Sequence, residues 1–255
     1  MREKRNKVNA AKGLTRDDRE PMRLNRFIAK AGVCSRREAD ALISEGKIRV
    51  NGTVTREMGL KVQVGTDVVE YQGKELTPQG KVYILLNKPK NMITTTSDER
   101  GRATVLDAIE RATRERVYPV GRLDRNTTGL LLMTNDGQLT KKLTHPSHEV
   151  VKLYKATLDK PLEEEHRQQL LEGIRLEDGH AIADAVDYPD PEQQEIVSIT
   201  VHIGRNRIVR RMFAHLGYEV KALDRTMLGP LTKKNLPRGK WRELNLKEVA
   251  WLKML

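Results

Sequence analysis

Residues 117–136 constrain the fold of this chain most strongly. An apolar segment, 117–120, leads into a polar loop that contains one acid, Asp124, and then into a second apolar segment, 130–133. Asn135-Asp136-Gly137 predicts a sharp turn after it. This order predicts two strands joined by a loop that presents a few side chains from a rigid scaffold. On composition alone, Asp124 and the neighbouring Arg122 are most simply an ion pair.

The chain has 255 residues, enough for one large domain or for a small domain joined to a medium one. Its formal net charge of +12 suits a polyanionic partner. We favour binding over an inert basic surface because the basic residues are clustered. Aromatic residues make up only 4%, which argues against a wide base-stacking platform. The single Cys34 excludes an internal disulfide and a multi-cysteine zinc site, and is consistent with a reducing compartment.

Membrane and secretory patterns are not found in the sequence. No apolar run approaches the roughly 20 residues that span a bilayer. The N-terminal charges are not followed by the apolar segment of a secretory signal. We therefore expect a cytoplasmic protein that makes no membrane contact.

The apolar pattern divides the chain into three parts. Residues 1–21 are charged and nearly devoid of large apolar groups, which predicts a flexible basic arm. The arm either adds weak contacts to a polyanionic partner or has no role. Residues 22–76 predict two short helices and a small strand-and-turn unit, a domain close to the smallest size that folds alone. A polar Gly/Pro stretch at 72–80 marks the boundary to a larger domain, residues 77–255.

Local signals within residues 22–76 are specific. The first helix carries its apolar residues on one face and ends near Gly32. Ser35 is a good N-cap for the second helix, and Glu38 stands where it completes a capping box. Asn51-Gly52 predicts a turn between two short strands.

The larger domain mixes strand and helix patterns. Strands are expected at 83–86, 150–158, 174–176, 181–186 and 196–203, and helices at 138–143, 162–171 and after Gly204. Residues 93–98 fit a strand or a loop equally well. Four arginines stand at the start of the last helix and need counter-anions, for which phosphate or a carboxylate would serve. His145 and His148 have no acidic or thiol partner at ligand spacing, so no metal site is expected.

The loop after residue 120 carries a longer pattern. It runs Gly121-Arg122-Leu123-Asp124, two free positions, Thr127, one free position, and Gly129-Leu130-Leu131-Leu132. This gapless string resembles the signature of the RsuA/RluB/RluE/RluF family of ribosomal RNA pseudouridine synthases. The aspartate of that motif is the family's essential catalytic residue, which implies that Asp124 is catalytic. The resemblance extends from about Met22 to the C-terminus, and residues 131–137 are most similar to the RluB-like branch that modifies large-subunit rRNA.

Further motifs carry the same resemblance. Lys152-Leu153-Tyr154 resembles the family's Lys-x-Tyr element, and residues 204–211 resemble its Gly-Arg-Asn-Arg-x-Val-Arg-Arg motif. The penultimate arginine of that motif pairs with the catalytic aspartate in the family. This implies Arg210 as the partner of Asp124, with Val209 packing near the target base. Without the family, Tyr154 would be an ordinary strand aromatic.

Asn87-Lys88-Pro89 resembles the Lys-Pro that family members carry at the edge of the active site. Three positions depart from the family pattern. Asn91 stands where a glycine is usual, Val151 where an acidic residue is common, and Ile208 where glutamine is frequent. The first departure is mild, because asparagine tolerates a left-handed backbone better than most residues do.

The N-terminal part shows a second resemblance. Ser35-Arg36-Arg37-Glu38-Ala39-Asp40, Gly46-Lys47-Ile48 and Val50-Asn51-Gly52 are similar to the RNA-binding domain of ribosomal protein S-four type, the alpha-L motif. Cations at the start of a helix oppose its dipole, so stability alone would not place Arg36 and Arg37 there. The resemblance implies that this domain binds RNA.

Together these resemblances imply an α/β (α+β) fold, in which a small alpha-L domain precedes a pseudouridine synthase domain with a mixed, mainly antiparallel sheet. The implied activity is the isomerisation of one uridine in ribosomal RNA. No electron, phosphate or metal is exchanged in that reaction, so we expect no cofactor and no metal. The implied catalytic residues are Asp124, Tyr154 and Arg210. The implied RNA-binding residues are Arg36, Arg37, Lys47, Asn51, Lys88, Arg122, Lys152, Arg205, Arg207, Val209 and Arg211. The implied partner is ribosomal RNA or a pre-ribosomal particle, bound by a monomer.

Other functions stay open. A non-catalytic RNA-binding or ribosome-assembly factor could keep the same fold, although the presence of Asp124, Tyr154 and Arg210 argues against it. An unrelated basic nuclease would usually need a cluster of metal-binding carboxylates, which we do not find in the sequence. Whether the aspartate acts as a nucleophile or as a base is also open.

Overall fold

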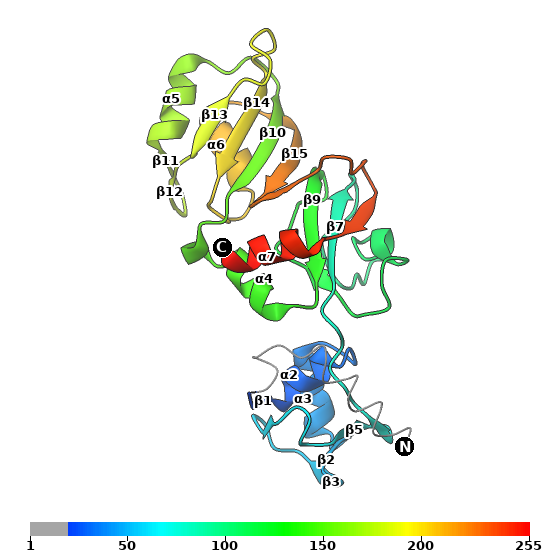
Figure 1. Cartoon of the computed structure of the whole chain (residues 1–255). Coiled ribbons are helices and arrows are strands. Elements are labelled where there is room, and N and C mark those ends of the chain that lie inside the picture. The colour runs from blue at the N-terminus through cyan, green and yellow to red at the C-terminus, as the bar shows by residue number, and fades with distance from the viewer. Residues whose placement is uncertain (1–19) are drawn as a thin grey trace. The chain divides into compact units, whose positions relative to one another are not determined.

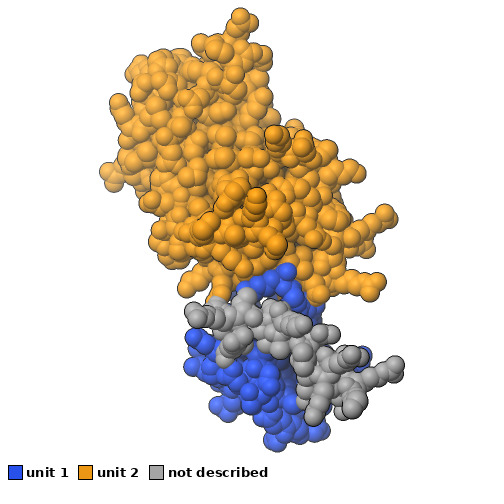
Figure 2. Space-filling model, in the orientation of Figure 1, with its two compact units in different colours: residues 1–81 blue, residues 82–255 orange. Residues whose placement is uncertain are grey.

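The computed structural model describes residues 20–255 (Figure 1). The chain forms two compact units, residues 1–81 and 82–255 (Figure 2). The arm predicted at residues 1–21 lies outside the described residues, apart from its last two positions. Hydrophobic clusters fill the interior of each unit.

The first unit combines two helices with short strands. Its elements are β1 (Met22–Arg23), α2 (Leu24–Lys30), α3 (Arg36–Ser44), β2 (Ile48–Val50), β3 (Thr53–Thr55), β4 (Lys61–Val62), β5 (Val69–Tyr71) and β6 (Lys74–Glu75). Strands β3, β2, β5 and β6 form an antiparallel sheet in that order, and β1 pairs with β4. The predicted succession of two helices and short strands is therefore confirmed.

Local sequence signals set the boundaries in this unit. The Ser35 hydroxyl accepts a hydrogen bond from the Glu38 N–H at 3.3 Å, and the Ser35 N–H donates to the Glu38 carboxylate at 2.6 Å. This capping box starts α3 as predicted. Asn51 and Gly52 have φ values of +51° and +79°, which the tight turn between β2 and β3 requires.

The second unit is built on one nine-stranded sheet. The path order of the sheet is β13-β14-β10-β15-β9-β7-β17, with β16 beside β15 and β8 beside β9. Its strands are β7 (Tyr83–Lys88), β8 (Tyr118–Pro119), β9 (Thr127–Thr134), β10 (Lys152–Leu158), β13 (Ala185–Asp187), β14 (Ile196–Val201), β15 (Val220–Leu228), β16 (Leu231–Thr232) and β17 (Trp241–Glu243). Every pair in it is antiparallel except β9 with β15. The predicted mixed, mainly antiparallel sheet is confirmed.

Helices and one separate hairpin surround this sheet. They are the short η2 (Asp107–Ile109) and η3 (Pro146–His148), α4 (Gly137–Thr144), α5 (Glu164–Glu172), α6 (Ile208–His215) and α7 (Leu246–Met254), with the hairpin of β11 (Ile174–Leu176) and β12 (Gly179–Ala181). Helix α7 lies beside α4, where the Lys142 ammonium donates to the Lys253 carbonyl oxygen at 2.7 Å (Figure 1).

Strand β9 is buried along all of its eight residues. Leu131 and Met133 belong to one hydrophobic cluster, which includes the buried residues of α6. Leu130 and Leu132 belong to another, which includes residues of α4 and α7. Because alternate residues of a strand face opposite sides, both faces of β9 pack against hydrophobic residues. This explains why the sequence of β9 is a continuous apolar run rather than an alternating one.

Two long elements, β15 and α7, are not among those expected from the sequence. Strand β15 contains Lys221, Asp224 and Arg225, which interrupt the apolar pattern that would indicate a buried strand. Helix α7 begins with a capping box between Asn245 and Glu248, a signal that is present in the sequence. The strand expected at 117–120 is shorter, since only the two residues of β8 are paired.

Strands β9 and β15 approach each other closely at Gly129. The register pairs Leu223 with Thr127, Asp224 with Thr128 and Arg225 with Gly129. Gly129 has a φ of +104°, and a Cβ there would lie 2.2 Å from the Arg225 carbonyl oxygen and 2.5 Å from its nitrogen. The strand pairing stops at this residue, and the Arg225 side chain continues the contact by donating from Nε to the Leu130 carbonyl oxygen at 2.7 Å.

Replacing Gly129 by alanine should lower the free energy of unfolding of the second unit by about 3 kcal/mol or more, because the methyl group overlaps backbone atoms and the positive φ is unfavourable. Both tryptophans, Trp241 and Trp251, lie in this unit, so denaturant unfolding followed by tryptophan fluorescence reports on it. Gly217→Ala is the control, because Gly217 has a φ of +80° but open space around it. It should lose only about 1 kcal/mol, and equal losses would contradict the steric explanation.

Candidate active site

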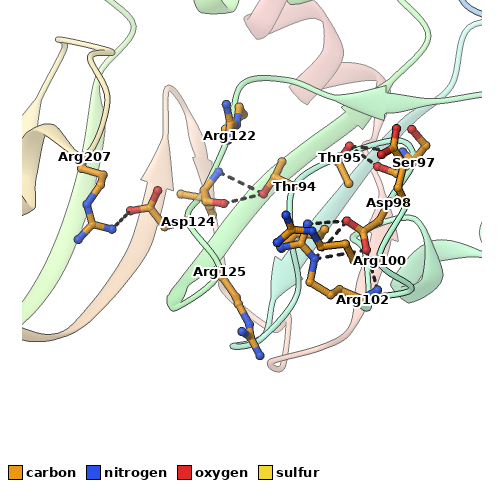
Figure 3. Close-up of a pocket in the computed structure, with 13 residues that line it drawn as sticks. Thr94, Thr95, Ser97, Asp98, Arg100, Arg102, Arg122, Asp124, Arg125 and Arg207 are labelled. Carbon is orange, nitrogen blue, oxygen red and sulfur yellow. Dashed lines mark hydrogen bonds and ion pairs between the residues drawn. The ribbon is translucent and has the colours of Figure 1, made fainter.

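A cavity of about 580 Å³ lies in the second unit beside the loop that carries Asp124 (Figure 3). The segment after β7 forms one wall, and the loop between β8 and β9 forms another. The residues that line it are Ile93, Thr94, Thr95, Ser97, Asp98, Glu99, Arg100, Arg102, Arg122, Leu123, Asp124, Arg125 and Arg207. Of the site residues implied by the sequence, Arg122, Asp124 and Arg207 therefore lie together at one cavity.

Asp124 and Arg207 form an ion pair at this cavity. Arg207 Nη1 donates to Asp124 Oδ2 at 3.0 Å (Figure 3). The Asp124 side chain is 34% exposed and that of Arg207 is 51% exposed, so water partly screens the pair. Arg207 is the N-cap of α6 and has a φ of +47°, in the left-handed region that side chains rarely adopt. The carboxylate is thus held in place while it remains accessible to a molecule in the cavity.

The hydrogen-bond partner of Asp124 differs from the expected one. Arg210, the partner implied by the sequence, donates from Nη1 to the Val220 carbonyl oxygen at 2.6 Å. The reason is geometric, because Arg207 precedes the first turn of α6 whereas Arg210 lies within the helix and reaches the start of β15. Burial lowers the pKa of Arg210, repulsion from Arg207 adds to this, and the charge of Asp124 opposes it. Arg210 therefore interacts with Asp124 through its charge.

Lys88 is the last residue of β7, and its side chain is fully buried. Its ammonium donates to the carbonyl oxygens of Pro89 at 3.1 Å, Asp124 at 3.1 Å, Arg125 at 3.2 Å and Thr127 at 2.8 Å. A buried ammonium cannot contact RNA, which corrects the role expected for Lys88 from the sequence. It fixes the backbone of the loop that carries Asp124.

Thr94 holds the same loop at the residue before Asp124. Its hydroxyl donates to the Leu123 carbonyl oxygen at 2.7 Å and accepts from the Leu123 N–H at 3.3 Å. Residues 93–98, which the sequence leaves open between strand and loop, form a loop with one isolated bridge from Ile93 to Thr104. Nothing in the local sequence distinguishes Thr94 from its neighbours, because its role depends on a contact 29 positions away.

Tyr154 lies in β10 and is 9% exposed. It stands opposite Arg225 of β15, which in turn stands opposite Gly129 of β9. Tyr154 therefore shares a row of the sheet with the start of β9 but does not belong to the cavity lining. Val209 is buried in α6 among the core residues.

Lys152 is two residues before Tyr154 on the same strand, and its ammonium donates to the carbonyl oxygens of Val150 and His202, both at 2.7 Å. Burial lowers its pKa to about 8, repulsion from Arg225 contributes, and Asp184 opposes the shift. The structure therefore gives this ammonium two backbone acceptors inside the protein.

Arg205 and Arg211 point away from Asp124. Both donate to Asp178, Arg205 from Nη1 at 2.9 Å and Arg211 from Nη2 at 2.7 Å. The four arginines at the start of α6 thus donate to the carboxylates of Asp124 and Asp178 and to the carbonyl oxygens of Asp178, His180 and Val220. Arg122 remains exposed at the cavity.

The implied RNA-binding residues of the first unit lie near α3 and the adjoining hairpin. Arg36 and Arg37 open α3 and are exposed. The Lys47 ammonium lies 2.5 Å from the Glu45 carboxylate, which raises the pKa of Lys47 by a hydrogen bond and by charge. The Asn51 side chain donates to Asp67 and accepts from the Val68 N–H, both at 2.9 Å. Asn51 therefore stabilises its own turn.

Within residues 20–255, no group of three or more His, Cys, Asp or Glu side chains could hold a metal ion. Over the same range, no helix is both long and apolar enough to cross a membrane.

Comparison with known proteins agrees with this fold. Residues 82–215 match the family described as RNA pseudouridylate synthase, and residues 22–68 match the S4 domain. An uncharacterized RNA pseudouridine synthase of Aquifex aeolicus is 42% identical over 91% of this chain and 93% of its own. The ribosomal large subunit pseudouridine synthase B of Bacillus subtilis is 43% identical over 91% of this chain and 96% of its own.

A solved structure described as a pseudouridylate synthase superimposes with a TM-score of 0.66 and 30% identity, over 91% of this chain and 99% of that one. The chain therefore belongs to the RNA pseudouridylate synthase family and carries an S4 domain before its synthase domain. It is an enzyme that isomerises uridine to pseudouridine in RNA.

Replacing Lys88 by methionine keeps the volume of the side chain but removes the donor for four carbonyl oxygens. The free energy of unfolding of the second unit should fall by about 2–3 kcal/mol, as measured by denaturant titration with tryptophan fluorescence. Lys90→Met is the control, because it removes the same charge from an exposed position two residues further along the chain. It should change the free energy of unfolding by about 0.5 kcal/mol at most. A similar small loss in both variants would show that the contacts of Lys88 do not stabilise the loop.

The burial of Lys88 also predicts a pH dependence. Burial lowers its pKa from 10.5 to about 8, with Asp124 opposing the shift, so the unfolded chain binds the Lys88 proton more tightly than the folded chain. Burial of the charged Lys88 lowers the free energy of unfolding by its full amount below about pH 8. This loss disappears as the pH rises to 10.5. The difference in unfolding free energy between wild type and Lys88→Met should therefore shift in favour of wild type by roughly 1–3 kcal/mol across this range. A difference that is constant with pH would refute the prediction.

Proposed function

We propose that this enzyme isomerises a uridine of large-subunit ribosomal RNA, with Asp124 as the catalytic carboxylate and without a cofactor. The observation that carries the proposal is the position of Asp124, which is accessible from the cavity while Arg207 fixes its carboxylate and Lys88 its backbone. The name of the Bacillus subtilis relative, a ribosomal large subunit pseudouridine synthase, supports the choice of RNA.

The chemistry needs only groups that a protein can supply. The bond between N1 of uracil and C1′ of ribose breaks, the base turns, and C5 of the base bonds to the same C1′. The proton lost from C5 is balanced by the proton that N1 gains. Asp124 acts either as a nucleophile towards the sugar or base, or as a base that removes a ribose proton. Reactant and product are isomers, so no electron or group has to come from a cofactor.

Tyr154 and Arg210 are proposed to assist Asp124. Tyr154 would stack on the uracil and accept or relay the proton lost from C5, and its place in the row of Gly129 and Arg225 supports this role. Arg210 would contribute positive charge near the carboxylate, in agreement with the interaction that opposes the lowering of its pKa. Val209 would pack near the base from the first turn of α6.

The substrate must present its uridine to the cavity outside the helical stack. Extracting a stacked base costs a few kcal/mol, which contacts to the RNA backbone can supply. The exposed Arg122 at the cavity, and Arg36, Arg37 and Lys47 in the first unit, are the proposed contacts. A cavity of about 580 Å³ lies within the range of roughly 300–1,000 Å³ that is usual for small-ligand sites, which suits one flipped nucleoside.

Asp124→Asn should abolish pseudouridine formation, with a loss of about 10³-fold or more, while RNA affinity changes little because the shape of the side chain is kept. Carbodiimide mapping of rRNA from cells that lack the gene should show one stop lost, restored by wild type and not by Asp124→Asn. Glu99→Gln removes an equal charge from the other wall of the cavity and should restore the stop. Full modification by Asp124→Asn would show that Asp124 is not the catalytic residue. An unchanged set of stops after deletion of the gene would show that rRNA is not the substrate.

A further inference from the structure

The turn between β11 and β12 contacts the segment that leads into α6. Arg205 Nη1 donates to the Asp178 carbonyl oxygen at 2.8 Å and to its carboxylate Oδ1 at 2.9 Å, and Arg205 Nη2 donates to the His180 carbonyl oxygen. The other carboxylate oxygen, Asp178 Oδ2, accepts from Arg211 Nη2 at 2.7 Å. One carboxylate thus joins two arginines that lie on either side of Arg207 in the sequence.

The backbone of Arg207 is held between these two arginines. Its carbonyl oxygen accepts the first helical hydrogen bond of α6 from the Arg211 N–H at 2.9 Å. On the other side, the Arg205 carbonyl oxygen accepts from the Ile208 N–H at 3.4 Å. The left-handed φ of +47° at Arg207 is unfavourable for an arginine, so it persists only where the flanking chain is fixed. Fixing the guanidinium groups of Arg205 and Arg211 provides that restraint.

We propose that Asp178 is a positioning residue for the reaction, which holds the chain on both sides of Arg207 and thereby aims the Arg207 guanidinium at Asp124. The inference rests on the proposed catalytic role of Asp124. Asp178 itself lies outside the cavity lining, so it acts through Arg207 rather than on the substrate.

Two further observations support this role. Arg211 Nε is buried and makes no hydrogen bond to any described residue, so the contact with Asp178 is the polar contact that orients this guanidinium. Gly179 follows Asp178 with a φ of +113°, and a Cβ on it would lie 3.4 Å from Arg205 Nη1. A Cβ at residue 179 would therefore be in van der Waals contact with the arginine that the turn holds.

A double-mutant cycle tests the proposal. Single-turnover rates of pseudouridine formation with excess enzyme, followed for hours where they are slow, are compared for wild type, Asp178→Ala, Arg207→Ala and the double variant. Asp178→Ala should lower the rate roughly 10- to 100-fold, because misplacing a charged group by an ångström or less has effects of this size. In the Arg207→Ala background the same replacement should change the rate less than threefold, because the residue through which it acts is gone.

The controls separate positioning from simple stabilisation. Glu177→Gln removes one negative charge from the same turn without touching the hydrogen bonds of Asp178, and should leave the wild-type rate unchanged. Asp178→Asn keeps the shape of the side chain and should lower kcat without raising KM. It replaces Asp178→Ala in the cycle if the alanine variant does not fold.

Each outcome bears on one hypothesis. A loss of rate from Asp178→Ala that is as large without Arg207 as with it overturns the positioning role, and so does an unchanged rate in the single variant. Full turnover by Asp124→Asn would instead overturn the proposed catalytic residue, whatever the cycle shows. Dependence of the Asp178 effect on Arg207, together with an inactive Asp124→Asn, supports both.

Discussion

The close approach of β9 and β15 at Gly129 is the constraint on which the second unit depends. The strands pair over only three residues and in parallel, and they join the part of the sheet that contains β7 and β17 to the part that contains β10, β14 and β13. The register places Lys88, Gly129, Arg225 and Tyr154 in one row across four strands. Asp124 lies in the loop that leads into β9, and Arg207 is the N-cap of α6, the helix that precedes β15. The candidate site therefore forms where the two parts of the sheet meet, and a side chain at residue 129 would separate the groups that the proposed reaction needs together.

The basic residues of the chain serve two purposes, which the net charge alone does not distinguish. Lys88, Lys152, Arg210 and Arg225 donate to backbone carbonyl oxygens inside the second unit. Such contacts satisfy carbonyl oxygens at strand ends and in loops that have no partner in the sheet. A cationic side chain that makes them points into the protein and not towards a nucleic acid. The net charge of +12 indicates a polyanionic partner correctly, since the family acts on RNA. It does not tell which cations meet that partner.

Sequence patterns predicted those features that depend on neighbours in the chain. The capping box of α3 and the turn at Asn51 are set by residues within three positions of one another, and both formed as expected. The apolar run of β9 sufficed to predict a buried strand. Strand β15 escaped prediction because Asp224 and Arg225 interrupt its apolar pattern, and the partners of these two residues include Thr128 and Leu130 of β9, 95 or 96 positions away. Contacts between positions so far apart leave no pattern in the local sequence.

The same distinction between local and distant contacts explains which parts of the candidate site could be predicted from the sequence. The motifs identified Asp124 and the arginines, because residue types at fixed spacing carry that information. Which arginine reaches Asp124 depended on the left-handed backbone of Arg207, and the roles of Lys88, Thr94 and Asp178 depended on contacts between distant segments. The family resemblance supplied the site, whereas the three-dimensional structure supplied its supports.

The loop that carries Asp124 combines a fixed backbone with exposed cationic side chains. Thr94 binds both polar backbone atoms of Leu123, and Lys88 binds the carbonyl oxygens of the next two residues, Asp124 and Arg125. Between these anchors Arg122 and Arg125 remain exposed. Under the proposed mechanism, a fixed backbone keeps the carboxylate in one position without reorganisation during the reaction, which favours catalysis. Exposed arginines on long side chains can follow phosphates whose positions change as a nucleotide leaves its stack. A fixed carboxylate and mobile side chains around it therefore arise in the same few residues, because Thr94 and Lys88 bind the backbone of the loop and leave Arg122 and Arg125 exposed.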